Sequence, residues 1–217
     1  MKPRWSNKRN AALTLVEVLI VSLVFVCFIV LVLTGLVDSR SKAQRINCMS
    51  NLKEIGIAFR LWESNRSDKD PTDSVTNGDM IASMTPGKAY VLWQTLSNRL
   101  GFPKIVWCPA DAKTEPANNF SIGFNDANIS YFVAPDASEA YPQMILDGDD
   151  NLLVDGKPVQ PGVLNLETNQ IIAWTKDRHH SVGNIGMADG SVAQVTTHGL
   201  QEALQQTGIA TNHLVLP

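Results

Sequence analysis

Residues 13–37, LTLVEVLIVSLVFVCFIVLVLTGLV, form an almost unbroken apolar run, and its interpretation decides how the rest of the chain is understood. Glu17 is the only charged residue in the run and lies near its start. A carboxylate held at membrane depth without a partner costs roughly 2.5–3.5 kcal/mol or more. The run therefore indicates either that it does not cross a membrane or that Glu17 has a partner there.

Three kinds of segment have a long apolar run near the N-terminus. A cleaved secretory signal has an apolar region of about 7–15 residues and then a small-x-small site. This run is longer, and the residues that follow it, TGLVDSRSKAQR, contain no such site. A plain membrane anchor fits the length, since about 20 apolar residues span the hydrocarbon core. It leaves Glu17 unexplained, whereas the third kind depends on the residues just before Glu17.

Residues 12–17, ALTLVE, resemble the type IV prepilin signal, in which a prepilin peptidase cuts after a small residue and methylates the new N-terminus. The family pattern is G-F-T-L-I-E, so the resemblance places cleavage between Ala12 and Leu13, with Ala12 standing where the family has Gly. Glu17 becomes the fifth residue of the mature chain. The resemblance implies that its carboxylate pairs with the N-terminal amine of a neighbouring subunit, which would give each buried charge a partner.

The charges are distributed unevenly along the chain. The first twelve residues, MKPRWSNKRNAA, carry four bases and no acid, and without them 14 bases remain against 21 acids. An acidic body without a basic stripe is not typical of a nucleic-acid-binding protein. A basic leader before an apolar run predicts a single-pass protein of the inner membrane, with its N-terminus in the cytoplasm and its body in the periplasm.

The helix is expected to continue beyond the apolar run. Residues 38–64 contain no proline, and apolar residues recur there at three- and four-residue spacings: Ile46, Met49, Leu52, Ile55, Phe59 and Trp62. This spacing predicts one apolar helix face. A single helix from about Leu13 to Glu63 would be roughly 75 Å long. It would be apolar all round in its first half and amphipathic in its second.

The remaining residues predict short helices and antiparallel strands. Residues 86–101 and 198–208 are expected to form helices that end at Gly101 and Gly208. Strands are expected at 128–135, in a hairpin at 152–159 and as a pair within 164–174. A two-residue hairpin turn is expected at Asp189-Gly190 within 184–196. Trp93, Trp107 and Trp174 are expected in the core.

This order of elements predicts the α+β class, with a long N-terminal helix packed on a C-terminal antiparallel sheet domain, as in pilins. The expected divisions are a leader (1–12), a transmembrane and assembly helix (13–37), its amphipathic continuation (38–65) and a periplasmic globular domain (66–217).

A second resemblance covers most of the chain. The stretch NCMSNLKEIGIAFRLWES is similar to the segment after the membrane helix in a large group of prepilin-type proteins of Planctomycetes- and Verrucomicrobia-like bacteria. Those chains often carry a CP-x-D step, as at Cys108, and a histidine that nine residues separate from Asp-Gly. Here nine residues separate His179 from Asp189 and Gly190. ISYF and GDDN also resemble that group.

Cys48 and Cys108 are the cysteines outside the apolar run, and both would lie where disulfides persist. A bond between them requires Cα atoms within about 7 Å. The alternative is that Cys48 packs as a small apolar residue.

DRHHSVGN (177–184) places two histidines near Asp177 and Asp189, which suggests a hydrolase or metal site. No motif of a known hydrolase surrounds them. We favour a structural role, in which Asp189 forms the turn and His179 caps a loop. The alternative function is a membrane-anchored periplasmic enzyme or binding domain that uses His179, His180 and Asp189.

LDGDDN (146–151) offers Asp147, Asp149 and Asp150 as candidate Ca²⁺ ligands, because major pseudopilins of type II secretion systems bind this ion. The EF-hand pattern is absent, and we favour a solvated acidic turn. No other cofactor is expected.

Taken together, the two resemblances imply a structural subunit of a type IV pilus-like or type II secretion fibre, which is not an enzyme. The implied partners are other pilin-like subunits, prepilin peptidase, and an inner-membrane assembly platform with its ATPase.

Overall fold

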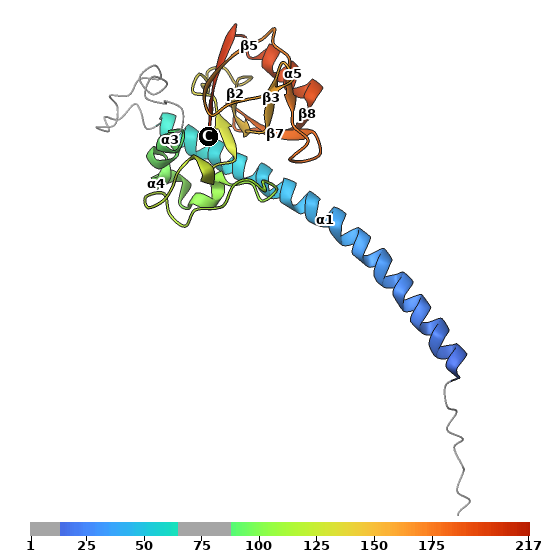
Figure 1. Ribbon diagram of the computed structural model, residues 1–217. Coiled ribbons are helices and arrows are strands. Elements are labelled where there is room, and N and C mark those ends of the chain that lie inside the picture. The colour runs from blue at the N-terminus through green and yellow to red at the C-terminus, as the bar shows by residue number, and fades with distance from the viewer. Residues whose placement is uncertain (1–13, 65–87) are drawn as a thin grey trace, which may run out of the picture. The chain divides into compact units, whose positions relative to one another are not determined.

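The chain has mixed α+β structure, with one long N-terminal helix and a C-terminal body of antiparallel strands and short helices. The computed structural model describes residues 14–64 and 88–217 (Figure 1). Helix α1 spans Leu15–Ser64, close to the bounds predicted from the sequence. The chain divides into two compact units between Lys42 and Ala43, so the end of α1 belongs to the body.

The first part of α1 has the length and composition of a membrane-crossing helix. Residues Leu15–Leu33 have a mean hydropathy of 3.2, and none of this span is buried. Its large apolar side chains are between 40 and 79% exposed. Among the described residues this is the one helix that meets both conditions.

The second part of α1 supplies one side of the body's core. Cys48, Leu52 and Ile55 are fully buried, and Phe59 is nearly so. These positions follow the predicted helical spacing, because residues three or four apart lie on one face. Ile46, which was expected on this face, is 65% exposed, so the buried face begins at Cys48 rather than two residues earlier.

A six-stranded antiparallel sheet forms the centre of the body, with the strand order β5-β9-β1-β2-β7-β8. Its strands are β1 (Tyr131–Val133), β2 (Ile145–Asp149), β5 (Gly162–Glu167), β7 (Val182–Met187), β8 (Val192–Thr196) and β9 (Thr211–Leu216). A smaller sheet has the order β4-β3-β6 and contains β3 (Leu152–Val154), β4 (Lys157–Pro158) and β6 (Ile172–Trp174).

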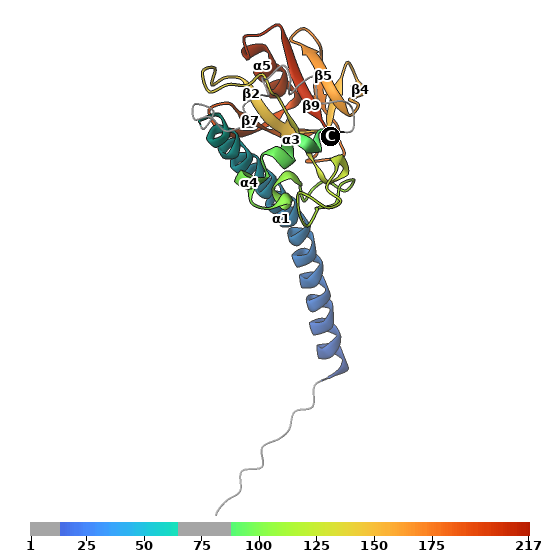
Figure 2. The same cartoon turned by 90° about the vertical axis from the view of Figure 1, so that its left-hand side faces the viewer.

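The large sheet separates two apolar cores. Successive residues of a strand point to opposite faces. Accordingly, Tyr131 and Val133 of β1 pack with the buried residues of α1, whereas Phe132 packs with Leu200 and Leu204 of α5 (Thr197–Gln206). Figures 1 and 2 show α5 and the end of α1 on opposite sides of this sheet.

The short helices and turns lie close to the glycines that the sequence marked as their ends. The segment ending at Gly101 is a helix pair, α3 (Tyr90–Thr95) and α4 (Ser97–Leu100), rather than one helix, and Gly101 has a φ of 79°. Two 3₁₀ helices follow, η2 (Pro103–Val106) and η3 (Asp126–Asn128). The predicted hairpin at Asp155-Gly156 is present, with φ values of 50° and 75° and Val154 paired with Lys157.

Some expectations about the strands are wrong. The two strands within 164–174 do not pair with each other, because β5 pairs with β9 and β6 pairs with β3. Strand β9, for which no strand was expected, lies between β5 and β1.

Two of the three tryptophans expected in the core, Trp93 and Trp174, are buried. The third, Trp107, is only half-buried.

Candidate functional site

A disulfide attaches the body half of α1 to the segment after η2. Cys48 and Cys108 are bonded, with Cα atoms 5.2 Å apart, within the 7 Å that the sequence-based expectation required. On the same helix, Gln44 Nε2 donates to the Pro109 carbonyl at 2.9 Å and Asn51 Nδ2 donates to the Trp107 carbonyl at 2.8 Å. The carbonyls on both sides of Cys108 are thus hydrogen-bonded to α1.

A buried guanidinium lies beside this disulfide segment. Arg178 Nη2 lies 2.5 Å from Asp111 Oδ2 and 2.6 Å from Asp150 Oδ1. Arg178 Nη1 donates to the Ser130 carbonyl at 2.8 Å and lies 3.9 Å from Asp149 Oδ1. We call these five residues the Arg178 cluster. Burial opposes the charge on Arg178, but the surrounding carboxylates outweigh this effect and raise its pKa.

The Arg178 cluster contains residues from three short motifs that lie far apart in the sequence. Asp111 belongs to the CP-x-D step, Ser130 to ISYF, and Asp149 and Asp150 to GDDN. One guanidinium contacts them all, so these motifs meet at a single place in the fold.

A left-handed backbone turn follows Arg178. His179, His180 and Ser181 have φ values of 53°, 58° and 64°. The left-handed conformation costs about 1–2 kcal/mol per residue for L-amino acids other than glycine. The turn leads directly into β7 at Val182, while Arg178 and His179 are buried and His180 is exposed. The buried contacts of Arg178 and His179 offset this strain.

His179 faces the disulfide. Its Nε2 lies 3.5 Å from Cys108 Sγ and 3.7 Å from Asp149 Oδ2. Burial and the nearby Arg178 charge lower the pKa of His179 to about 4, so the imidazole is neutral near pH 7. His179 therefore packs in the interior, where its Nε2 lies beside Cys108 and Asp149 rather than beside loop backbone as expected.

The residues of the proposed hydrolase site do not come together around His179. Asp177 is exposed and pairs with Lys113 at 2.6 Å. Asp189 lies in the β7–β8 loop, where its Oδ1 accepts a hydrogen bond from the Ser191 backbone N–H at 2.8 Å. The exposed His180 and the buried His179 point to different surroundings. The geometry offers no shared site for His179, His180 and Asp189.

The three calcium candidates are not a solvated turn, so that expectation is wrong. Asp147 and Asp149 are fully buried in β2. Asp147 lies against Gly186, whereas Asp149 and Asp150 turn towards Arg178. Among the described residues these acids do not gather as a group of metal ligands.

Burial changes the protonation of these acids. It raises the pKa of Asp147 well above its usual range. It also raises the pKa of Asp149 to about 7, against the opposing Arg178 charge, and raises that of Asp150. The guanidinium supplies the positive charge that a calcium ion would otherwise provide to Asp149 and Asp150.

The Asp189-Gly190 turn differs from the predicted two-residue type. Only Gly190 has a positive φ, 80°. Gly190 N donates to the Met187 carbonyl at 2.9 Å, and Met187 N donates to the Ser191 carbonyl at 2.8 Å. The loop therefore has one more residue than predicted, and the left-handed position falls on Gly190 alone.

Glu17 has a local partner that the sequence analysis missed. Its Oε2 accepts hydrogen bonds from both the backbone N–H and the hydroxyl of Thr14, each at 2.8 Å. The Glu17 N–H donates in return to the Thr14 hydroxyl at 3.3 Å. This reciprocal pattern is a capping box, whose Thr-x-x-Glu signal is visible in the sequence. The proposed cleavage residues, Ala12 and Leu13, lie outside the described residues.

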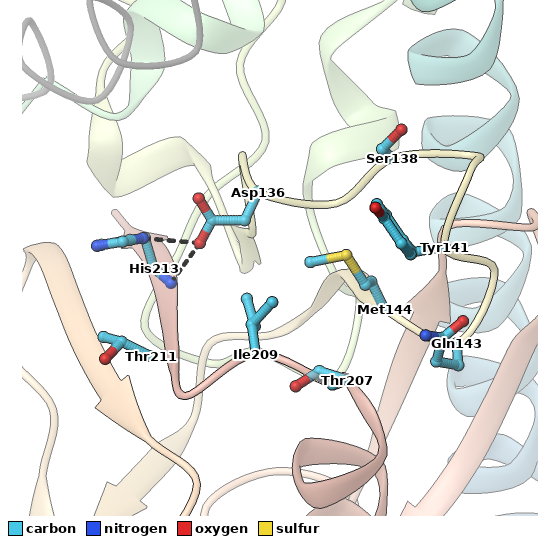
Figure 3. A pocket seen from close by; sticks show the side chains of 10 residues that line it. Asp136, Ser138, Tyr141, Gln143, Met144, Thr207, Ile209, Thr211 and His213 are labelled. Carbon is cyan, nitrogen blue, oxygen red and sulfur yellow. Dashed lines mark hydrogen bonds and ion pairs between the residues drawn. The ribbon is translucent and has the colours of Figure 1, made fainter.

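A cavity of about 550 Å³ lies between the loop after β1 and the loop before β9 (Figure 3). At one side, His213 donates through its backbone N–H to Asp136 Oδ2 at 2.9 Å, and its Nδ1 lies 2.7 Å from the same oxygen. Figure 3 shows the imidazole pointing away from Tyr141 and Met144. The His213–Asp136 pair therefore joins the loop after β1 to strand β9 at the rim of the cavity.

In comparisons with known proteins, no protein-family model, no curated protein and no solved structure matched the chain.

Arg178 and Asp136 are the main residues that the sequence analysis did not identify. Each gains its role through partners more than 25 residues away in the chain, so no local pattern marks it. The capping residue Thr14 is different, because its spacing from Glu17 is itself a signal.

Proposed function

We propose that this chain is a pilin-like structural subunit, a pseudopilin of a type IV pilus-like or type II secretion fibre. In this proposal, prepilin peptidase processes the chain, the inner membrane stores it, and an ATPase-driven platform assembles it with other pilin-like subunits. Its role is assembly rather than catalysis, and its body lies in the periplasm.

One observation carries the proposal: a single helix is exposed and apolar at one end and provides the core of a folded body at the other. Leu15–Leu33 has no buried residue, whereas Cys48, Leu52 and Ile55 are fully buried. Apolar side chains on all faces of a helix need an apolar environment. Lipid provides it for the stored subunit, and neighbouring copies of the same helix provide it in a fibre.

The contacts of Glu17 are compatible with an assembly role. The capping box uses one carboxylate oxygen, Oε2, for both hydrogen bonds from Thr14. In the proposal, the other carboxylate oxygen, Oε1, pairs with the N-terminal amine of a neighbour. Capping and pairing are therefore compatible in the same side chain.

The position of the mature N-terminus tests the proposal. We expect mass spectrometry of the protein, purified from membranes of cells with a working prepilin peptidase, to show a chain that begins at Leu13 with a methylated amine. Ala12→Gly, which restores the family residue, should be processed at least as completely. Ala12→Leu should block processing, because the peptidase requires a small residue there. A wild-type chain that keeps Met1 would contradict the proposal.

A further inference from the structure

Three potential metal ligands meet where the second half of α1 packs against the rest of the body. Cys48, Cys108 and His179 place their donor atoms within 4.8 Å of one another, and all three residues are buried. They come from three separate segments: α1, the loop after η2 and the left-handed turn before β7. In the disulfide form the two sulfur atoms are bonded to each other, so metal binding requires the dithiol form.

We propose that the reduced protein binds one Zn²⁺ ion per chain through the thiolates of Cys48 and Cys108 and Nε2 of His179. The disulfide and the metal are alternative ways of closing the same site. This inference does not depend on the proposed assembly role.

The spacing of the donor atoms fits tetrahedral zinc. Zn–S bonds are about 2.3 Å and Zn–N bonds about 2.0–2.1 Å, so tetrahedral ligands of these kinds lie about 3.5 Å apart. The observed distance from His179 Nε2 to Cys108 Sγ is 3.5 Å. The Cys48 and Cys108 backbones are already adjacent, with Cα atoms 5.2 Å apart. Little movement beyond separating the two sulfurs is needed.

A buried, hydrogen-bonded carboxylate lies beside the three ligands as an outer partner. Asp149 Oδ2 lies 3.7 Å from His179 Nε2, and the Asn184 N–H and side-chain amide hold it at 2.8 and 2.9 Å. Asp149 Oδ1 is buried, and none of the described residues donates a hydrogen bond to it. Two thiolates neutralise the charge of Zn²⁺, so the bound ion adds no net charge beside the Arg178 cluster. Such hydrogen-bonded outer partners are typical of protein metal sites.

The disulfide form and the zinc-bound form interconvert through a two-electron reduction or oxidation of the two cysteines. A dithiol reductant transfers two electrons and two protons to the Cys48–Cys108 bond and itself becomes a disulfide. The two thiols then release their protons as they bind Zn²⁺. Oxidation by a disulfide-class oxidant removes two electrons, forms the S–S bond again and releases the ion. The metal form thus keeps α1 attached to residue 108 wherever reductants break the disulfide.

Metal binding to the full-length protein in detergent tests this proposal. After anaerobic reduction with a phosphine and removal of the reductant, we expect the protein to bind one Zn²⁺ per chain, and the oxidised protein to bind none at this site. With Co²⁺ as the probe, the reduced protein should show thiolate charge-transfer bands and the strong visible bands of tetrahedral cobalt. Reoxidation should abolish both sets of bands.

His179→Ala removes a direct ligand, so it should weaken Zn²⁺ binding by at least the roughly tenfold that loss of an outer-shell partner causes, and it should change the cobalt spectrum. His180→Ala is the matched control, because it alters the neighbouring left-handed position without touching the donors, and it should bind like the wild type. Circular dichroism checks that each reduced variant is folded. No Zn²⁺ uptake on reduction would overturn the proposal. The proposal would also be overturned if His179→Ala bound Zn²⁺ as tightly as the wild type. Binding by the two thiols of an unfolded chain would give that result.

Discussion

Replacing Arg178 with alanine should destabilise the body more than any surface change. The substitution leaves Asp111 buried without its 2.5 Å partner and removes the cation from Asp149 and Asp150. Breaking a buried ion pair by deleting one partner costs about 3–5 kcal/mol. For a body of this size, that loss lowers the unfolding temperature by about 6–20 °C. The Ser130 carbonyl also loses its donor, which acts in the same direction.

Thermal unfolding followed by circular dichroism, on full-length protein in detergent, measures this effect. Lys113→Ala is the control, because it removes an ion pair whose side chains are 75 and 59% exposed, and its unfolding temperature should hardly change. Arg178→Lys keeps the charge but not the forked geometry, so it should fall between the two. If Arg178→Ala unfolded within about 2 °C of the wild type, the Arg178 cluster would not be a stabilising element.

Four further predictions concern the body. Burial raises the pKa of Asp147 well above its ordinary value of 3.8, so the folded body holds a proton there that the unfolded chain releases. Its contribution to stability is complete below about pH 4 and declines as pH rises towards the folded-state pKa. Asp147→Asn needs no proton, so urea unfolding should show it more stable than the wild type near pH 7 and little different near pH 4. Equal destabilisation at both pH values would contradict this. Gly190→Ala should lower the unfolding free energy by about 1 kcal/mol or more, since φ is 80° there. Gly56→Ala, in helix α1 with ordinary contact distances, should raise it by about 0.5–1 kcal/mol, and the same urea titrations decide both signs. Reducing the Cys48–Cys108 bond in the presence of a metal chelator should lower the unfolding free energy by about 2–5 kcal/mol, and an unchanged urea midpoint would refute a stabilising role for the bond.

The long helix could be predicted because its signal is local and repeated. Apolar residues without interruption, followed by a three- and four-residue spacing, gave both its extent and most of its buried face. Gly101, Gly156 and Gly208 marked turns correctly, since each adopts a positive φ that glycine tolerates.

Strand pairing could not be predicted in the same way. Strand β9 is the last element, yet it lies between β5 and β1, and nothing near Thr211–Leu216 indicates those neighbours. Strand β2 was obscured by its acids, because Asp147 and Asp149 look exposed in sequence but are buried where β2 pairs with β7, a strand far along the chain. Local composition therefore indicated a turn where a central strand lies.

In the candidate site, too, some residues could be predicted from local motifs and others could not. Short motifs indicated Cys48, Cys108 and His179, but the residue that joins the motifs, Arg178, was passed over between two more conspicuous neighbours. Its role depends on four groups from three other segments, which only the folded chain brings together.

Fibre yield from Glu17→Gln tests the assembly claim most directly. Glutamine at this position preserves the capping box with Thr14, because Glu and Gln both serve there, while the charge for a neighbouring amine is lost. We expect normal processing and membrane insertion but at least about tenfold fewer sheared fibres per membrane-bound subunit, as with Glu17→Ala. Val18→Ala, at the adjacent exposed position, should assemble normally. A wild-type yield from Glu17→Gln would contradict the pairing and leave α1 as a plain anchor.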